Sequence, residues 1–193
     1  MRPLPFVWPY LLLFWGVHLW AFWPEFRIMR TARRTATAQD AKSLQVITYG
    51  MWIGYFGAYA MAWVPALQIH AHRAAVFSTG VLLVVAGSLL RRHCWRMLGV
   101  SFTGDVRANE GQEIITRGAY AFLRHPSYTA GTLMNVGIGV ALGSWASALV
   151  LLVVSVAVYL HRIEVEERAL LAVLGEPYAR FARTRKRLIP FIY

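Results

Sequence analysis

The sequence contains few acidic residues and almost no cysteine. It has nine Asp and Glu residues against 20 Lys and Arg residues, and charged residues make up only 15% of its 193 positions. Because Cys94 is the only cysteine, neither an intramolecular disulfide nor a CxxC metal site can form. His70 and His72 lie close together but supply too few ligands for a metal ion. We therefore expect no metal.

The sequence also lacks the motifs of common soluble enzymes. It has no Ser-His-Asp set, no Gly-rich nucleotide loop after a predicted strand and no internal repeat. The N-terminus carries a single charge, Arg2, and the first apolar run ends in WPEF rather than in small residues. This pattern favours a retained helix over a cleaved signal peptide.

Apolar side chains are abundant instead. They make up 58% of the chain, and the mean hydropathy is +0.45, which indicates a protein of the lipid bilayer. The net charge of +11 fits the basic cytoplasmic loops of membrane proteins, so it does not require a nucleic-acid partner. The predicted fold is an all-α integral membrane protein.

Five apolar stretches are predicted to cross the membrane as helices. They comprise residues 6–26, 44–69, 75–90, 127–142 and 145–160. The last two are each about 24 Å long as helices, shorter than the hydrocarbon core of about 30 Å, and Gly143-Ser144 separates them. We therefore predict a short hairpin there. Pro65 is expected to kink the second span.

The distribution of charge predicts the orientation. Arg2 and Arg73 fall on one side of the spans, and the other 18 basic residues fall on the opposite side with all nine acids. The positive-inside rule then places the N-terminus outside and the C-terminus in the cytoplasm. The basic tail, residues 180–187, is expected to contact anionic lipid.

The chain is predicted to fold as one integrated domain with two parts. Residues 1–98 would supply the three N-terminal transmembrane helices. Residues 99–193 would form the cofactor-binding core from a polar loop, the hairpin and a cytosolic C-terminal amphipathic helix.

Small and polar residues recur every four positions in the fourth span and share one helix face. They are Ser127, Gly131, Asn135, Gly139 and Gly143. The glycines permit close approach of either another helix or a flat ligand. The amide of Asn135 needs hydrogen-bond partners within the apolar layer, and these could come from a neighbouring helix or a ligand.

The tripeptide Arg124-His125-Pro126 precedes this span. Pro126 suits the first turn of a helix, where its missing N–H costs nothing. The unpaired amides and positive dipole of the helix start would attract a ligand carboxylate, and Arg124 would add a two-pronged clamp. The alternative is that Arg124 and His125 are ordinary interfacial residues.

An acidic residue is predicted on the apolar face of the C-terminal helix. Glu167 shares a helical stripe with Ile163, Leu170 and Leu174. A carboxylate in that position needs a partner. The partner could be Arg124 or Arg162 in a structural ion pair, or it could be a hydroxyl or amine of a ligand. Gly175 is predicted to end this helix.

Several of these segments together resemble one enzyme family. TRGAYAFLRHPSY, EVEERALL, GEPYARF and RLIPFI, spread over residues 99–192, resemble the isoprenylcysteine carboxyl methyltransferase family and its phospholipid-methyltransferase-like relatives. Members of that family are integral-membrane enzymes that use S-adenosylmethionine and release S-adenosylhomocysteine.

The resemblance implies roles for particular residues. The expected catalytic residues are Arg124, Arg162 and Glu167. The expected cofactor-binding residues are Tyr120, His125, Pro126, Tyr128, Glu166 and Glu167. Asn135 and Gly131 are expected to contact the acceptor.

The acceptor implied by the resemblance is a lipophilic small molecule or a lipidated protein end, reached from the surrounding membrane lipid. A carboxylate acceptor is already ionised and needs no general base. The segment from Thr129 to Thr132 is smaller and less aromatic than a prenyl-binding groove suggests, so an amine or thiol acceptor stays open. Two other functions compete: an NADPH-dependent enzyme like the sterol reductases, and a non-catalytic assembly or lipid-binding protein. The sequence leaves the oligomeric state open.

Overall fold

The computed structural model describes residues 1–35, 38–99 and 114–189, and the regular elements in these ranges are all helical. The long helices are α1 (Tyr10–Thr35), α2 (Ala38–Ala62), α3 (Arg73–Leu98), α4 (Pro126–Ala141) and α5 (Trp145–Leu174). The short ones are α6 (Glu176–Thr184) and the 3-10 turns η1 (Leu4–Phe6), η2 (Pro65–Leu67) and η4 (Gly118–Ala121). The predicted all-α class is therefore confirmed for the described residues.

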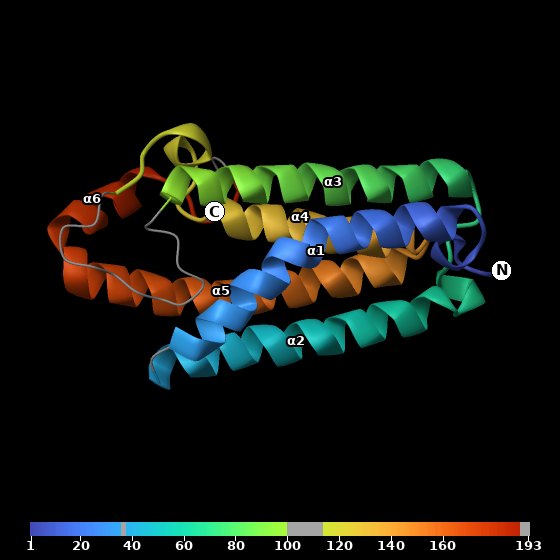
Figure 1. The fold of residues 1–193 in the computed structure, drawn as a ribbon, viewed down its shortest axis with the longest axis horizontal. Helices are drawn as coiled ribbons and strands as arrows, with labels where there is room; N and C mark the ends of the chain where they lie inside the picture. The colour runs from blue at the N-terminus through green and yellow to red at the C-terminus, as the bar shows by residue number, and fades with distance from the viewer. Residues whose placement is uncertain (36–37, 100–113, 190–193) are drawn as a thin grey trace.

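Helix α4 runs through the middle of the bundle, between α3 and α5 (Figure 1). Its contact with α3 depends on small residues, because a methyl group added at Gly80 would overlap the backbone of Gly137 and Ala141. Gly139 of the predicted stripe faces α5 in the same way, against the backbone of Ala148. These glycines therefore serve helix packing.

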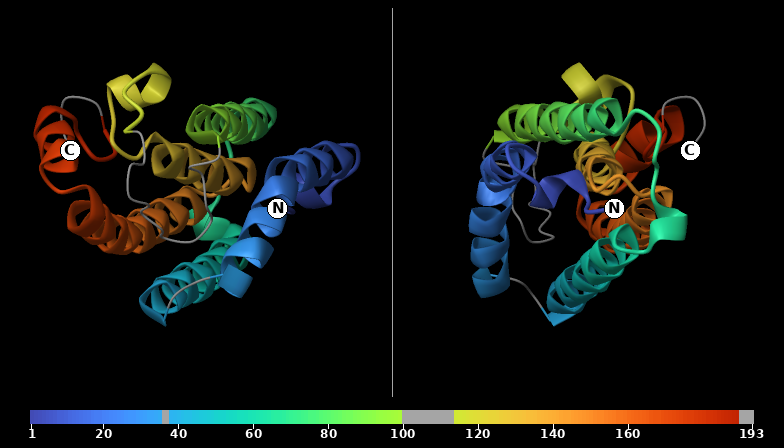
Figure 2. Two further views of the ribbon diagram at one scale, coloured as in Figure 1. Left: turned by 60° about the vertical axis from the view of Figure 1, so that its left-hand side comes forward. Right: turned by 90° about the vertical axis from the view of Figure 1, so that its right-hand side faces the viewer.

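Helix α2 packs against α5, whereas α1 crosses the bundle and contacts α3 (Figure 2). Gly50 and Gly54, four residues apart on α2, lie against Val158 and Val154 of α5. The hydroxyl of Ser147 donates to the carbonyl oxygen of Ala58 at 2.6 Å and adds a polar link between these helices.

Three local predictions are confirmed. Pro126 begins α4. Gly143 has φ of +72°, and the hydroxyl oxygen of the next residue, Ser144, caps α5 by accepting from the backbone N–H of Ser147 at 3.2 Å. Gly175 has φ of +59° and ends α5, after which α6 begins.

Three predicted boundaries are wrong. The first helix continues past residue 26 to Thr35, and the second ends at Ala62, so Pro65 starts the turn η2 instead of kinking a helix. Helix α5 runs without a break to Leu174, so the segment around Glu167 is its continuation and not a separate amphipathic helix. Helices α1 and α5 extend past their predicted ends for the same reason. An apolar run shows which residues can contact lipid, whereas a helix continues for as long as its backbone N–H and C=O groups remain hydrogen-bonded.

Two described helices, α3 and α5, are long and apolar enough to cross a membrane. The predicted number of five crossings is therefore not confirmed, although five long helices are present. The N-terminus lies beside the start of α3, where the guanidinium of Arg73 donates to the carbonyl oxygen of Arg2. The first part of the polar loop predicted within residues 99–193, residues 100–113, lies outside the described residues.

Candidate active site

A cavity of about 1080 Å³ lies within the bundle, and each of the helices α1 to α6 contributes to its walls. One end of it is polar and is built around the start of α4. The other end is an apolar and aromatic arm between α1 and α2, whose walls include Trp15, Phe22, Met51 and Tyr59. The two ends form one continuous space.

Backbone pairing fixes the polar end. The N–H of Arg124 donates to the carbonyl oxygen of Lys186 at 2.8 Å, and the N–H of His125 donates to that of Arg187 at 3.1 Å. The chain following α6 is thereby held against the entry to α4. Residues distant in sequence are thus brought to one point.

The carboxylate of Glu167, on α5, contacts three basic side chains at this point. Its Oε1 lies 2.8 Å from Nη1 of Arg124 and 3.1 Å from Nε2 of His125. Its Oε2 accepts from Nη2 of Arg187 at 2.8 Å. Only 7% of the residue is exposed, so these basic groups offset the cost of burying its charge.

The neighbouring carboxylate faces the cavity. Oε2 of Glu166 accepts from the hydroxyl of Tyr128 at 2.9 Å and lies 3.8 Å from Nδ1 of His125. The ring of Tyr128 stacks between those of His125 and Tyr159, with centroids 5.8 Å and 5.0 Å away. Aromatic faces and a carboxylate therefore line the same wall.

Two polar atoms at this end are buried without a hydrogen-bond partner among the described residues. They are the hydroxyl oxygen of Tyr178, on α6, and Nε of Arg124. Burial, with the nearby carboxylates of Glu167 and Glu166, raises the pKa of the Tyr178 phenol, so the hydroxyl stays protonated and available as a donor. Burial likewise raises the pKa of Tyr120, on η4. Unpaired buried groups are rare and indicate a missing partner.

Arg162 takes partners from the start of α2. Its Nη1 contacts the carboxylate of Asp40 and the hydroxyl of Ser43, and all three residues are buried. Arg162 also lines the cavity and hydrogen-bonds Tyr128. It therefore connects α2 to the wall formed by α4 and α5.

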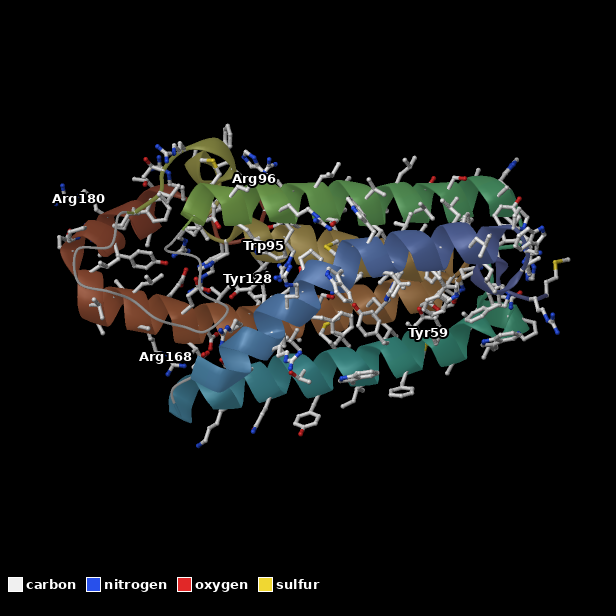
Figure 3. The ribbon with its side chains drawn as sticks, in the orientation of Figure 1. Tyr59, Trp95, Arg96, Tyr128, Arg168 and Arg180 are labelled. Atoms are coloured by element: carbon white, nitrogen blue, oxygen red, sulfur yellow. The ribbon has the colours of Figure 1, made fainter. Side chains whose placement is uncertain are left out.

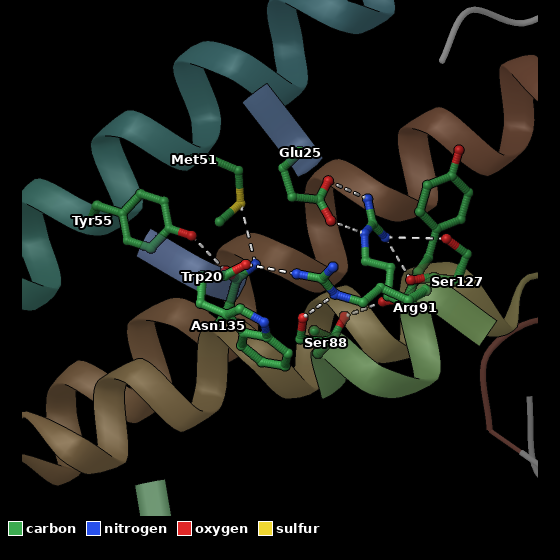
Figure 4. Close-up of polar contacts among 11 residues, drawn as sticks. Trp20, Glu25, Met51, Tyr55, Ser88, Arg91, Ser127 and Asn135 are labelled. Carbon is green, nitrogen blue, oxygen red and sulfur yellow. Dashed lines mark hydrogen bonds and ion pairs between the residues drawn. The ribbon is translucent and has the colours of Figure 1, made fainter. Parts of the chain in front are cut away.

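A second arginine, partly buried, lies where the polar end meets the apolar arm. Arg91, on α3, grips Glu25 of α1 with two nitrogens, one of them Nη2 at 3.0 Å, and its Nη1 donates to the backbone oxygen of Ser127 at 2.6 Å (Figure 4). Glu25, Arg91 and Ser127 all line the cavity. This pair ties α1 to the first turn of α4.

Asn135 finds the partners that its position requires. Its Oδ1 accepts from the hydroxyl of Tyr55 at 2.6 Å, and its Nδ2 donates to the hydroxyl of Ser155 at 2.9 Å (Figure 4). Neighbouring helices therefore satisfy the amide. Gly131 lies against Tyr159 and Arg91, and both Gly131 and Asn135 line the cavity.

The structure brings most of the predicted site residues to this cavity. Those that line it are Tyr120, Arg124, His125, Tyr128, Gly131, Asn135, Arg162 and Glu166. Glu167 and Pro126 do not line it. Pro126 starts the helix, and Glu167 holds the side chains of Arg124 and His125 from behind.

Sequence reasoning missed several residues of the site. They are Glu25, Asp40, Arg91, Tyr178 and Arg187. A signal for Arg91 was available, because it continues the stripe of Gly80, Val84 and Gly87 on the buried face of α3. No group of three or more His, Cys, Asp or Glu residues that could hold a metal occurs among the described residues.

The described elements are helical, two of them are long and apolar enough to cross a membrane, and their polar site opens into an apolar arm. Residues 80–172 match the model of the isoprenylcysteine carboxyl methyltransferase family, and the predicted resemblance to this family is confirmed.

Individual relatives agree with the family match. Protein-S-isoprenylcysteine O-methyltransferase B of Arabidopsis thaliana is 31% identical over 115 residues, which are 58% of this chain and 58% of that protein. The enzyme of Mus musculus is 30% identical over 60% of this chain and 41% of its own length. The chain therefore matches about half the length of these relatives.

The fold has a solved counterpart. A structure of a eukaryotic intramembrane Ras methyltransferase, an isoprenylcysteine carboxyl methyltransferase, superposes with a TM-score of 0.70 at 23% identity. The superposition covers 98% of this chain and 70% of that one. The match extends to the N-terminal helices, for which the sequence offered no motif.

Proposed function

We propose that this protein transfers a methyl group from S-adenosylmethionine to the carboxylate of a lipophilic acceptor at the membrane. The observation that supports it best is the single cavity that joins a polar end to an apolar arm. Its volume of about 1080 Å³ is at the upper limit of the roughly 300–1,000 Å³ typical for one small ligand, so it has room for two reactants.

The residues at the polar end fit the cofactor. S-adenosylmethionine has a carboxylate, an amine, a ribose, an adenine ring and no phosphate. The free Nε of Arg124 suits the carboxylate, and the unpartnered hydroxyl of Tyr178 suits a ribose or adenine acceptor. Glu166 suits the amine, and the aromatic wall that includes Tyr128 and Tyr120 suits the adenine.

The pairing of the cavity arginines with carboxylates disfavours NADPH as the cofactor. Four arginines line the cavity among the described residues, and three of them, Arg91, Arg124 and Arg162, each pair with a carboxylate. A phosphate-bearing cofactor needs cations with uncompensated charge. A cofactor without phosphate fits this balance better.

Bound S-adenosylmethionine supplies an electrophilic methyl group on a sulfonium centre. The chain supplies alignment and exclusion of water, because a carboxylate acceptor is already ionised and needs no general base. Alignment of two reactants can lower a barrier by about 7–11 kcal/mol. We assign Arg124 to the cofactor, Arg162 to the wall that orients the acceptor, and Glu167 to positioning Arg124 and His125.

The acceptor tail would occupy the apolar arm and enter from the lipid between α1 and α2, whereas the cofactor would enter from the cytoplasmic side. Asn135 and Gly131 would lie beside the acceptor. In this proposal residues 99–193 supply most of the cofactor site, and the N-terminal helices supply the arm. The N-terminus would lie outside and the C-terminus in the cytoplasm.

Calorimetric titration of the purified protein in detergent tests the proposal, with S-adenosylhomocysteine and NADPH as parallel ligands. We expect micromolar binding of S-adenosylhomocysteine alone. Binding of NADPH alone would replace the proposal with the reductase function. Binding of neither ligand by protein that is monodisperse and folded would favour a non-catalytic role.

A further inference from the structure

The apolar arm contains polar atoms that no residue of the described chain satisfies. Trp15 and His18, on α1, and Tyr59, on α2, line the cavity. Nδ1 of His18 is fully enclosed without a hydrogen-bond partner among the described residues. Within the same part of the chain, no partner is found for Nε2 of His18, Nε1 of Trp15 or the hydroxyl of Tyr59, and these three atoms are not enclosed.

The three rings are neighbours. The Trp15 centroid lies 5.6 Å from that of His18 and 6.3 Å from that of Tyr59. His18 also stacks on Phe22 with centroids 4.7 Å apart, which fixes its ring. The three rings therefore form one continuous part of the cavity wall.

Other polar groups in this part of the bundle have hydrogen-bond partners. The hydroxyl of Tyr55, one helical turn from Tyr59, is bonded to Asn135, and Ser147 is bonded to the backbone of Ala58. Polar groups in the apolar layer are costly unless they are paired. The three unpaired atoms that are not enclosed, on Trp15, His18 and Tyr59, therefore stand out, and a ligand would account for these three.

The chemistry of the three groups specifies what they would bind. The indole of Trp15 can only donate a hydrogen bond, and the hydroxyl of Tyr59 can donate one. An enclosed lone pair is tolerated better than an enclosed N–H, so we assign the His18 proton to Nε2, which makes it a third donor. Three hydrogen-bond donors require an acceptor atom on the ligand, and the apolar surroundings of the arm favour an acceptor without charge.

The position of the cluster relates it to the acceptor. His18 precedes Glu25 by seven residues on α1, which is about 10 Å along the helix, and Glu25 marks the junction with the polar end. Tyr59 and Tyr128 lie at different levels along the bundle (Figure 3). The cluster would therefore meet the tail of the acceptor and not its reacting end.

We propose that Trp15, His18 and Tyr59 form a hydrogen-bonding subsite for a neutral oxygen, such as a ketone, on the apolar tail of the acceptor. This inference rests on the proposed function and specifies its substrate class. A plain hydrocarbon tail would leave the three donors unpaired, so the subsite favours an oxygen-bearing lipid over an unsubstituted chain.

Direct binding of eighteen-carbon fatty acids to the protein in detergent tests the subsite. The series consists of the unsubstituted acid and its analogues with a ketone at the sixth, ninth or twelfth carbon. We expect at least one keto acid to bind about three- to tenfold tighter than the unsubstituted acid, as one neutral hydrogen bond would provide. Equal affinity across the series, or no binding by any member, would overturn the proposal.

Variants separate this hydrogen bond from general packing. Tyr59→Phe and His18→Phe should each weaken the preference for the keto acid and should not lower the affinity for the unsubstituted acid. Tyr49→Phe is the matched control, because Tyr49 is an exposed tyrosine of α2 outside the cavity, and it should keep the preference. An undiminished preference in both cavity variants would contradict the assignment.

The cofactor is measured separately with S-adenosylhomocysteine on the same samples. Its binding together with equal affinity for all the acids would reject the subsite and retain the proposed function. Absence of its binding together with a keto-acid preference would reject the methyltransferase proposal and retain the subsite as a lipid site.

Discussion

Oε1 of Glu167 lies 2.8 Å from Nη1 of Arg124, although 43 positions separate the two residues in the chain. The same carboxylate binds His125 and, through its other oxygen, Arg187. Three chain segments, the entry to α4, the C-terminal part of α5 and the chain after α6, therefore meet at one buried charge.

Replacing Glu167 with alanine should affect both stability and binding. The change leaves three basic groups without their shared partner, and breaking a buried ion pair in this way costs about 3–5 kcal/mol. We expect a lower Tm in detergent and loss of S-adenosylhomocysteine binding, measured by thermal denaturation and calorimetry. Glu166→Gln is the comparison, because Glu166 is partly exposed, and it should weaken binding with little change in Tm. Unchanged Tm and affinity in Glu167→Ala would remove its positioning role.

Tyr178→Phe should weaken ligand binding without lowering the stability of the protein. The substitution removes a buried hydroxyl that has no partner within the described chain, so the ligand-free protein should be as stable as before or slightly more so. Affinity for S-adenosylhomocysteine should fall about three- to tenfold, the value of one hydrogen bond. A loss of Tm without a loss of affinity would show that the hydroxyl has a structural partner instead.

Arg124→Ala should lower turnover at least about tenfold, because the charge-assisted contact that we propose between its Nε and the cofactor would be lost. Arg124→Lys retains the charge but not the forked geometry, so we expect it to recover only part of the rate. Initial rates at saturating acceptor, with S-adenosylmethionine varied, provide the measurement. Full activity in the alanine variant would make Arg124 an ordinary interfacial residue.

Gly80→Leu should prevent α3 and α4 from packing. Even a single methyl group at this position overlaps the backbone of Gly137 and Ala141, so the two helices would have to separate. We expect little monodisperse protein in detergent, measured by size-exclusion chromatography. Gly16→Leu is the control, since a side chain at Gly16, on α1, meets no atom within 4 Å, and its yield should be normal. Normal yield for both variants would contradict the close packing.

Local features of the fold could be predicted because their causes are local. Pro126 starts a helix, Gly143 turns the chain and Gly175 ends a helix for reasons contained in a few residues. The need of Asn135 for partners and of Glu167 for a basic residue also followed from residue type and periodicity. Arg124 was one of the two partners considered for Glu167, and the structure pairs them.

The remaining pairings could not be predicted because they depend on how the helices are arranged. Arg162 was an equal candidate for Glu167, yet it binds Asp40, 122 positions away, since α2 lies against α5. Arg91 and Glu25 likewise meet only because α1 crosses the bundle beside α3. With 20 basic residues and nine acids, composition leaves many such pairings open. The packing of the bundle selects among them.

The continuity of α5 has a consequence for the surrounding bilayer. Its 30 residues form a rod of about 45 Å, with apolar residues toward its start and Glu166 and Glu167 toward its end. The depth at which the apolar part settles in lipid therefore sets the height of both carboxylates relative to the membrane surface. A change in hydrocarbon thickness would be relieved by tilting of this rod. Under the proposed function, the alignment of the cofactor with an acceptor held in the lipid, and with it the rate, should therefore vary with the chain length of the host lipids.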